Sequence, residues 1–354
     1  MADNWNLDGN KLLWHMDRVH KHFVQGKRIV PITIDMGLTK FCNVKCEFCY
    51  GMFQGVSGEM IPRKALVQLF KDAPKVGVKA IAMVGDGEPT LNPAMMEATE
   101  AGAAGGLDMA MATNGVLVGS MLRDLLPRLV WFRFNLSAIE EGYEIVHGKK
   151  YWEKVKANVK MAVDIKKRYD LPVTIGLQMV LTRNALPYVL REARFAIDAG
   201  VDYFVIKQFS DPKCEDMKGI SAEEQNSPAV QNVLKKAMAM STKRTKIIAK
   251  LKAMEYGMKR PYDHCYDVPL YFQISGNGKA YPCGYLFNDD RYCYGDITKQ
   301  SFGEIINSER YWSIVKTLQT TFDVHKDCVG CCRHDSTNKF ISDFVHPPQH
   351  INFI

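Results

Sequence analysis

The 354-residue sequence has no uninterrupted apolar stretch long enough to span a bilayer. Its first ten residues are polar and lack the basic-then-apolar order of a signal peptide. It contains no internal repeat, no low-complexity tract and no phosphate-binding loop. The missing membrane-spanning stretch and the missing signal-peptide pattern argue against a membrane protein or a secreted protein. We therefore expect a cytoplasmic location and no membrane partner.

The composition, 47% hydrophobic and 24% charged, suits one large domain or two smaller ones. The net charge of +7 could indicate nucleic acid or an anionic substrate. The densest lysine run, residues 235–246, is better explained as a solvated helix face, and we find no nucleic-acid module. We therefore expect a small-molecule substrate, and the positive charge weakly favours one linked to a phosphate or nucleotide.

Ten cysteines in a cytoplasmic protein are expected to be thiols or metal ligands rather than disulfides. Three of them, Cys42, Cys46 and Cys49, form a Cys-x3-Cys-x2-Cys triplet. Three thiolates can hold three corners of a [4Fe-4S] cluster and leave the fourth iron open to a chelating molecule, whereas an electron-transfer cluster normally takes four cysteines. A zinc site or a disulfide set is the alternative, but zinc prefers four ligands.

Strand-like and helix-like segments alternate along the first two thirds of the chain. The triplet follows an apolar run, Ile29–Met36, that is typical of a buried strand. Right-handed crossovers would join six such strands into a partial parallel barrel, which places its chemistry at the C-terminal strand ends. Further strands are predicted over 80–84, 109–112, 130–136, 173–181 and 203–207, and helices over 63–73, 94–104, 121–126, 149–167 and 186–199.

The triplet, with Phe48 directly before its third cysteine, resembles the signature of the radical S-adenosylmethionine (radical SAM) superfamily. This resemblance covers most of the chain and implies an α/β fold with a partial (β/α)6 barrel. It also implies that SAM binds at the open iron and is cleaved reductively to a 5′-deoxyadenosyl radical, which abstracts hydrogen from a C–H bond. The electron would come from an external reductant such as flavodoxin or ferredoxin.

The stretch Gly85-Asp86-Gly87-Glu88 follows the second predicted strand, where glycines let the backbone approach a ligand. It is similar to the Gly-Gly-Glu stretch with which the family binds the SAM amino group, although Asp86 replaces a glycine. An ordinary turn acid is the alternative for Glu88, and packing is an equal alternative for Gln178. The resemblance predicts further cofactor contacts for Phe48 and for five polar residues near later strand ends: Thr113, Asn114, Asn135, Ser137 and Gln178.

A second cysteine group follows later in the chain: Cys265, Cys283, Cys328 and Cys331. With Gly278 it resembles the twitch (SPASM-like) module of some radical SAM enzymes, which holds an auxiliary [4Fe-4S] cluster on four thiolates. Cys332 could replace Cys331, but the Cys-x2-Cys spacing favours Cys331. A four-cysteine zinc knuckle is the alternative. A β-hairpin over 271–281 would carry Cys283 close to Cys265.

These predictions divide the chain into five segments. The apolar end of the last one is expected to pack against the barrel or close its bottom. The segments are an N-terminal helical extension (1–27), the radical SAM core (28–212), a helical connector (213–257), a small cysteine-rich β-hairpin/α twitch domain (258–340) and a C-terminal tail (341–354).

The auxiliary cluster predicts how the reaction ends. A substrate radical beside a deprotonated hydroxyl can lose its electron to a nearby cluster and become a ketone. The cysteine spacing resembles that of a cyclitol dehydrogenase among the twitch enzymes. The leading prediction is therefore dehydrogenation of an alcohol carbon in a sugar, aminosugar or cyclitol. Candidates for the assisting base are Lys207, Arg333, His334 and Asp335.

Cys214, just past the sixth predicted strand, is predicted to be a catalytic hydrogen-atom donor, with an ordinary loop cysteine as the alternative. With that role the reaction would be a redox-neutral epimerisation. Modification of a ribosomally made peptide is a third possibility, although the segment before Ile29 is short for the peptide-recognition domain of many such enzymes. A two-cluster electron carrier is disfavoured by the open three-cysteine site.

Overall fold

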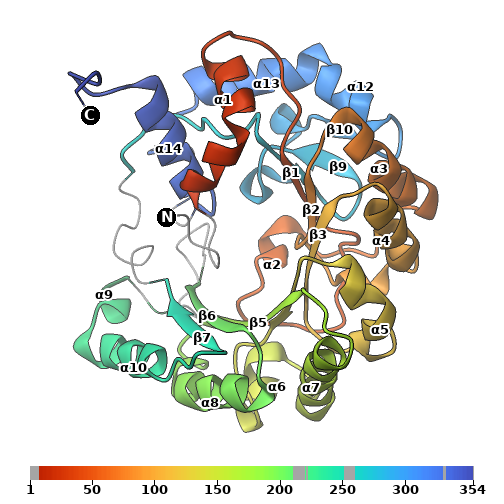
Figure 1. Ribbon diagram of the computed structural model, residues 1–354, viewed down its shortest axis with the longest axis vertical. Helices are drawn as coiled ribbons and strands as arrows, with labels where there is room; N and C mark the ends of the chain where they lie inside the picture. Colours follow the sequence, from red (N-terminus) through yellow and green to blue (C-terminus); the bar gives the residue numbers. More distant parts are fainter. Residues whose placement is uncertain (1–7, 210–219, 221, 251–259, 330–331, 354) are drawn as a thin grey trace.

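The computed structural model describes residues 8–209, 220, 222–250, 260–329 and 332–353. It is an α/β structure built on one curved sheet with the strand order β10-β9-β8-β1-β2-β3-β4-β5-β6-β7 (Figure 1). The strands are β1 (Thr33–Met36), β2 (Ala80–Met83), β3 (Asp108–Thr113), β4 (Trp131–Asn135), β5 (Thr174–Leu181), β6 (Tyr203–Gln208), β7 (Lys246–Ala249), β8 (Tyr271–Ile274), β9 (Lys279–Tyr281) and β10 (Gly295–Asp296).

Helices surround this sheet, and most of them lie on its convex side (Figure 1). They are α1 (Met16–Phe23), α2 (Gly51–Gln54), α3 (Arg63–Val76), α4 (Met95–Ala104), α5 (Leu122–Leu125), α6 (Glu141–His147), α7 (Trp152–Arg168), α8 (Val189–Ala199), α9 (Ala222–Gln225), α10 (Pro228–Ala239), α12 (Phe302–Asn307), α13 (Glu309–Thr320) and α14 (Asp335–Val345). Short 3-10 helices are η1 (Gly9–His15), η2 (Pro89–Leu91), η3 (Val118–Ser120), η4 (Leu126–Arg128), η5 (Leu186–Tyr188), η6 (Gly284–Leu286) and η7 (Asp290–Tyr292).

The six predicted strands are present as β1 to β6, and each is parallel to the next. Their alternate residues separate two faces. On β4, for example, Phe132 and Phe134 are fully buried in the main hydrophobic core, while Arg133 between them faces the concave side. The C-terminal strand ends therefore open onto a polar interior.

The sheet continues beyond the six-strand barrel at both edges. β7 adds to β6 in parallel, so the segment predicted as a helical connector contains a strand after α9 and α10. At the other edge β8 pairs in parallel with β1, with Thr33 opposite Tyr271. The predicted hairpin is formed by β8 and β9, but it shares the barrel's sheet. Periodicity along the chain carries no information about such distant strand pairing, which explains the difference.

The N-terminal segment and α14 lie together (Figure 1) and share a small second core that includes Leu12, Val19 and Ile341. The chain beyond α14 does not pack as predicted. Ile351 is 56% exposed and Phe353 is 86% exposed, so the expectation that the apolar end of the tail packs against the barrel is wrong. Within the described ranges, no helix has both the length and the apolar character needed to cross a bilayer.

Candidate active site

The three-cysteine loop follows β1 and is held against the strand ends by two sets of contacts. The backbone N–H groups of Lys45 and Glu47 donate to the last turn of α6, to His147 O (3.0 Å) and Val146 O (2.9 Å). The Glu47 carboxylate also accepts hydrogen bonds from Thr182 Oγ1 (2.6 Å) and Asn184 Nδ2 (2.8 Å), just past β5. The loop is thus fixed between α6 and the end of β5.

All three cysteines of this loop are half-buried. Burial raises the pKa of Cys42 to about 11 and raises that of Cys46 well above its usual value. A thiol in such surroundings becomes a thiolate when a cation binds it, because the ion's charge offsets the cost of desolvation. Among the described residues, no three His, Cys, Asp or Glu side chains converge closely enough to hold a single metal ion. Three thiols on one loop can each bind one iron of a cubane cluster.

A buried histidine contacts the second cysteine of the triplet. Cys46 Sγ lies 3.0 Å from His147 Nδ1, while the backbone N–H of Ser137 donates to His147 Nε2 at 3.0 Å. Because Nε2 accepts that bond, the ring proton is on Nδ1 and points at the sulfur. The ring stacks on Tyr143 and meets Phe48 edge-on, with centroid distances of 4.4 Å and 5.6 Å. This contact could not be predicted from the sequence, because the two residues are 101 positions apart and α6 was not predicted.

The glycines after β2 serve a close backbone approach. A Cβ added at Gly85 would lie 2.2 Å from Gly37 N, and one at Gly87, which has φ +72°, would lie 2.0 Å from Thr39 O. Side chains at these positions would push the cluster loop away from the end of β2. Contact of Gly85 and Gly87 with SAM stays a prediction.

Glu88 is 2% exposed and joins the ends of β2 and β3. Its Oε1 accepts from Thr90 N (3.2 Å), Thr90 Oγ1 (2.7 Å) and Thr113 Oγ1 (2.7 Å), and its Oε2 accepts from Asn114 N (2.8 Å). Burial raises the pKa of this carboxyl, and the hydrogen bonds oppose the rise. Glu88 therefore orders the turn that is predicted to bind SAM, and a direct contact between Glu88 and SAM remains a prediction.

Asp86 connects the same turn to the C-terminal hairpin. Its Oδ2 accepts from Ser275 Oγ and its Oδ1 from Gly276 N, both at 2.8 Å. The carboxylate is 6% exposed, and burial raises its pKa. Asp86 thus ties the barrel to the β8–β9 turn. Its predicted contact with the cofactor has no further support in these bonds.

The remaining predicted cofactor residues lie along the C-terminal edge of β3, β4 and β5. Asn114 Nδ2 donates to Asn43 Oδ1 (2.6 Å) and approaches Cys42 Sγ (3.8 Å), so this edge touches the cluster loop. Gln178 Nε2 donates to Asn135 Oδ1 (3.2 Å), and the buried Gln178 Oε1 has no partner among the described residues. Ser137 Oγ accepts from the backbone of β5. These residues form a polar rim at the ends of β3, β4 and β5, where SAM is predicted to bind.

Three cysteines of the second group and the alternative ligand Cys332 line one cavity. They are Cys265, Cys283, Cys328 and Cys332. Burial raises the pKa of Cys283 to about 12 and that of Cys332 well above its usual value. Four thiols around one cavity fit an auxiliary cubane cluster. Cys331, predicted as the fourth ligand, lies outside the described residues, whereas its alternative Cys332 lines the cavity. We therefore assign the fourth position to Cys332 as a proposal.

The four candidate bases have different surroundings. Arg333 forms an ion pair with the buried Asp35 on β1. His334 Nδ1 lies 2.9 Å from Asp267 Oδ2, and Asp335 Oδ1 accepts from the Tyr262 hydroxyl at 2.6 Å. Lys207 on β6 is different, because burial and then the nearby Arg133, Lys250 and Arg333 lower its pKa well below the usual lysine value. The predicted hydrogen-atom donor Cys214 lies outside the described residues.

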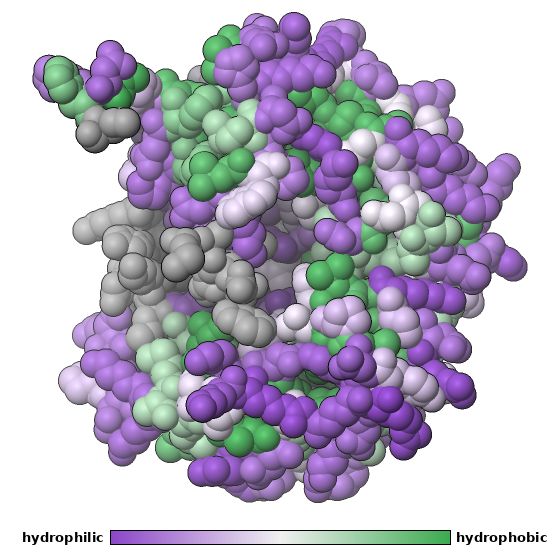
Figure 2. Space-filling view, viewed as in Figure 1, coloured by the Kyte–Doolittle hydropathy of each residue, from purple (hydrophilic) through white to green (hydrophobic). Residues whose placement is uncertain are grey.

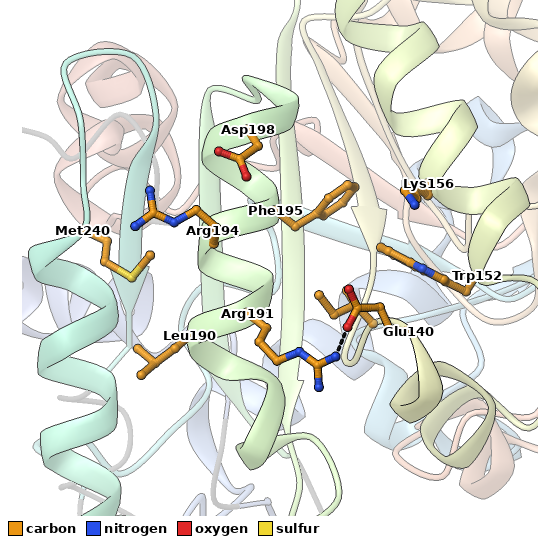
Figure 3. A pocket seen from close by; sticks show the side chains of 10 residues that line it. Glu140, Trp152, Lys156, Leu190, Arg191, Arg194, Phe195, Asp198 and Met240 are labelled. Atoms are coloured by element: carbon orange, nitrogen blue, oxygen red, sulfur yellow. Dashed lines mark ion pairs between the residues drawn. The ribbon is translucent and has the colours of Figure 1, made fainter.

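A separate cavity of about 500 Å³ lies on the outer surface between α7, α8 and α10 (Figure 3). Arg191 pairs there with Glu140, which has φ +55°, and Trp152 and Phe195 form part of the wall. None of the predicted cluster or cofactor residues lines this cavity. It is therefore distinct from the chemistry at the strand ends.

Comparison with known proteins is consistent with this geometry. Residues 36–184 match the radical SAM superfamily, and residues 265–333 match the SPASM iron–sulfur cluster-binding domain. The chain is 24% identical over 316 residues, 82% of this chain and 85% of the relative, to a tungsten-containing aldehyde ferredoxin oxidoreductase cofactor-modifying protein of Pyrococcus furiosus. It is 27% identical over 135 residues, 36% of this chain and 45% of the relative, to an S-adenosylmethionine-dependent nucleotide dehydratase of Flammeovirga pacifica.

Two solved structures share the fold. SuiB of Streptococcus suis, bound to S-adenosylmethionine, has a TM-score of 0.63 at 14% identity, and the alignment covers 94% of this chain and 78% of that one. The structure of anSMEcpe with bound AdoMet has a TM-score of 0.62 at 14% identity, covering 90% of this chain and 98% of that one.

The two matched domains and the thiols found within them imply two [4Fe-4S] clusters and SAM as cofactors. The first cluster would be held by Cys42, Cys46 and Cys49. The chain is therefore a member of the radical SAM superfamily with a C-terminal SPASM iron–sulfur cluster-binding domain.

Proposed function

We propose that the protein oxidises an alcohol carbon of a sugar, aminosugar or cyclitol to a ketone. The observation that carries this proposal is Lys207. This residue is a potential proton acceptor on the inner face of the barrel, close to Arg333, which directly follows Cys332. Lys207 and the segment Cys332–Arg333 thus lie close together on the inner side of the barrel.

When bound, SAM and the first cluster supply abstraction of a hydrogen atom from carbon, and the second cluster accepts one electron. The chain must then remove one proton. In our account the substrate would lose a hydrogen atom from its alcohol carbon, the hydroxyl proton to Lys207 and one electron, which a cluster held by Cys265, Cys283, Cys328 and Cys332 would accept. A C=O bond forms, and the substrate has lost two hydrogens in total. One electron from an external reductant such as flavodoxin or ferredoxin would start each cycle, and the auxiliary cluster would return its electron to a carrier of the same kind before the next turnover.

Lys207 suits the proton transfer because its surroundings favour the neutral amine. A lysine can act as a general base only where its pKa lies near the working pH. Desolvation and three neighbouring cations have that effect here. The other candidates are less suitable, because Arg333, His334 and Asp335 are each paired with another side chain.

The relatives support a small-molecule substrate. The Pyrococcus furiosus relative is described as cofactor-modifying and the Flammeovirga pacifica relative as acting on a nucleotide. On this basis we favour a small molecule over a peptide, and an anionic one over a neutral one. Redox-neutral epimerisation with Cys214 as hydrogen donor is the alternative. We also expect the protein to act in the cytoplasm.

The test is turnover of candidate sugars and cyclitols in deuterated water by the anaerobically reconstituted enzyme. We expect 5′-deoxyadenosine and a ketone without solvent deuterium at carbon. In Lys207→Met we expect 5′-deoxyadenosine to persist while the ketone is lost, and in the surface control Lys149→Met we expect no change. An isomeric product carrying solvent deuterium would favour epimerisation, and absence of 5′-deoxyadenosine would refute the enzymatic account.

A further inference from the structure

The inner face of the barrel carries charged side chains where its outer face is apolar. On β1, Ile34 and Met36 belong to the main core, so Asp35 faces inward. On β6, Phe204 and Ile206 belong to that core, so Lys207 faces inward. Together with the inward Arg133 of β4, these residues place ionisable groups around one interior.

Neighbouring inner positions are occupied by small residues, which leave room for a ligand. Ala82 on β2 and Ala112 on β3 alternate with the core residues of their strands, and Ala112 is in register with Arg133. The molecular face in Figure 2 is hollowed at its centre, with hydrophilic side chains inside. Arg333 reaches the inner face of the barrel, where it pairs with Asp35. Its side chain is 40% exposed, although it pairs with Asp35, whose side chain is 1% exposed.

Two guanidinium groups lie close together in this group. Arg133 and Arg333 both act electrostatically on Lys207 and on each other, and Asp35 acts on Lys207 with the opposite sign. Asp35 already pairs with Arg333. Two guanidinium groups held close together inside a protein repel each other, and an anion bound between them offsets that repulsion.

Arg133 also has unused hydrogen-bonding capacity. Its guanidinium bonds to Tyr203, which is close by because both residues are in register with Gly176. Its Nε is buried and has no partner among the described residues. A planar guanidinium with a free N–H suits two-point binding of a carboxylate or phosphate.

We propose that Arg133 and Arg333 bind an anionic group of the substrate, a phosphate or a carboxylate, on the inner face of the barrel. This inference rests on the proposed function only in taking the anion to be part of the substrate. The anion would anchor the substrate below the polar rim at the ends of β3, β4 and β5 and leave the substrate hydroxyl next to Lys207. The site itself exists whether or not the oxidation occurs.

The test measures anion binding without SAM or reductant, so that it is separate from turnover. Inorganic phosphate and acetate are titrated into the anaerobically reconstituted protein by calorimetry at constant ionic strength. The two probes distinguish a phosphate site from a carboxylate site. We expect one of them to bind, and Arg133→Gln and Arg333→Gln each to weaken it by about ten- to a hundredfold, the range for hydrogen bonds to charged groups.

Two controls make the result decisive. Arg123→Gln removes an equal charge from the exposed surface of α5 and should leave binding unchanged. Arg133→Lys keeps the charge but loses the planar fork, so its binding should fall between that of the wild type and Arg133→Gln. Iron content and thermal unfolding show whether each variant folds. Equal binding by the wild type, Arg133→Gln and Arg333→Gln would overturn the inference, as would failure of both probes to bind the wild type. Intact anion binding without ketone formation would count against the proposed oxidation alone.

Discussion

His147 Nδ1 lies 3.0 Å from Cys46 Sγ and, because its Nε2 accepts the Ser137 N–H, presents a proton to that sulfur. The ring is fully buried, stacks on Tyr143 and meets Phe48 edge-on, so its orientation is fixed. Hydrogen bonds to cysteine sulfur are one way in which a protein sets the potential of a cluster. They favour the reduced, more negative state.

The first prediction is that His147→Phe lowers the reduction potential of the SAM-binding cluster. Loss of one N–H···S bond worth about 1 kcal/mol corresponds to roughly 40–50 mV for a one-electron couple. A redox titration followed by electron paramagnetic resonance measures the change. Tyr143→Phe keeps the stacked ring and the hydrogen bond and should leave the potential unchanged. An unchanged potential in His147→Phe would show that the contact is only structural.

The second prediction concerns the Glu88 network. All four partners of the Glu88 carboxylate donate hydrogen bonds, so in Glu88→Gln the amide NH2 must face a donor. We expect the free energy of unfolding to fall by about 1–3 kcal/mol and SAM binding to weaken. Chemical denaturation and SAM titration measure the two effects. Glu97→Gln, which breaks an exposed ion pair with Arg63, should cost less than about 1 kcal/mol.

The third prediction assigns the fourth auxiliary ligand. Since Cys332 shares a cavity with three other cysteines, Cys332→Ser should lose the auxiliary cluster and about half of the iron, because each cubane holds about four. Iron analysis and electron paramagnetic resonance measure the loss. Cys293→Ser is the control, since Cys293 lies outside that cavity and its thiol bonds to Gly295 O. Full iron content in Cys332→Ser would return the assignment to Cys331.

The fourth prediction is a pH dependence of ketone formation. Lys207 must be neutral to accept a proton, so the rate should rise with pH through its lowered pKa and level off below the usual lysine value. Arg133 is one of the cations that lower this pKa, so Arg133→Gln should move the rising limb to higher pH. The measurement is the amount of ketone formed per 5′-deoxyadenosine at each pH. The same limb in Lys207→Met would contradict the assignment.

Features encoded locally in the sequence were predictable. Apolar runs predicted β1 to β6 in order, and the Cys-x3-Cys-x2-Cys spacing predicted the cluster loop. The turn Ser275–Gly278 of the predicted hairpin is also present, with Gly278 N bonded to Ser275 O.

Features that depend on distant pairing were not predictable. β8 joins β1 across more than half the chain, and His147 reaches Cys46 from a helix with no distinctive pattern. Asp35 and Arg133 nevertheless carry a signal in the sequence that indicates the polar interior of the barrel. Each is a charged residue at an inward position of an otherwise apolar strand, and such a residue is costly to bury without a partner or ligand.

The fate of the substrate hydrogen tests the central claim most directly. A substrate deuterated at the alcohol carbon is turned over once in ordinary water, and both products are analysed by mass spectrometry. The account predicts one deuterium in 5′-deoxyadenosine and a ketone formed in equal amount. Deuterium in 5′-deoxyadenosine together with an isomeric alcohol that has gained a solvent hydrogen at that carbon would contradict it.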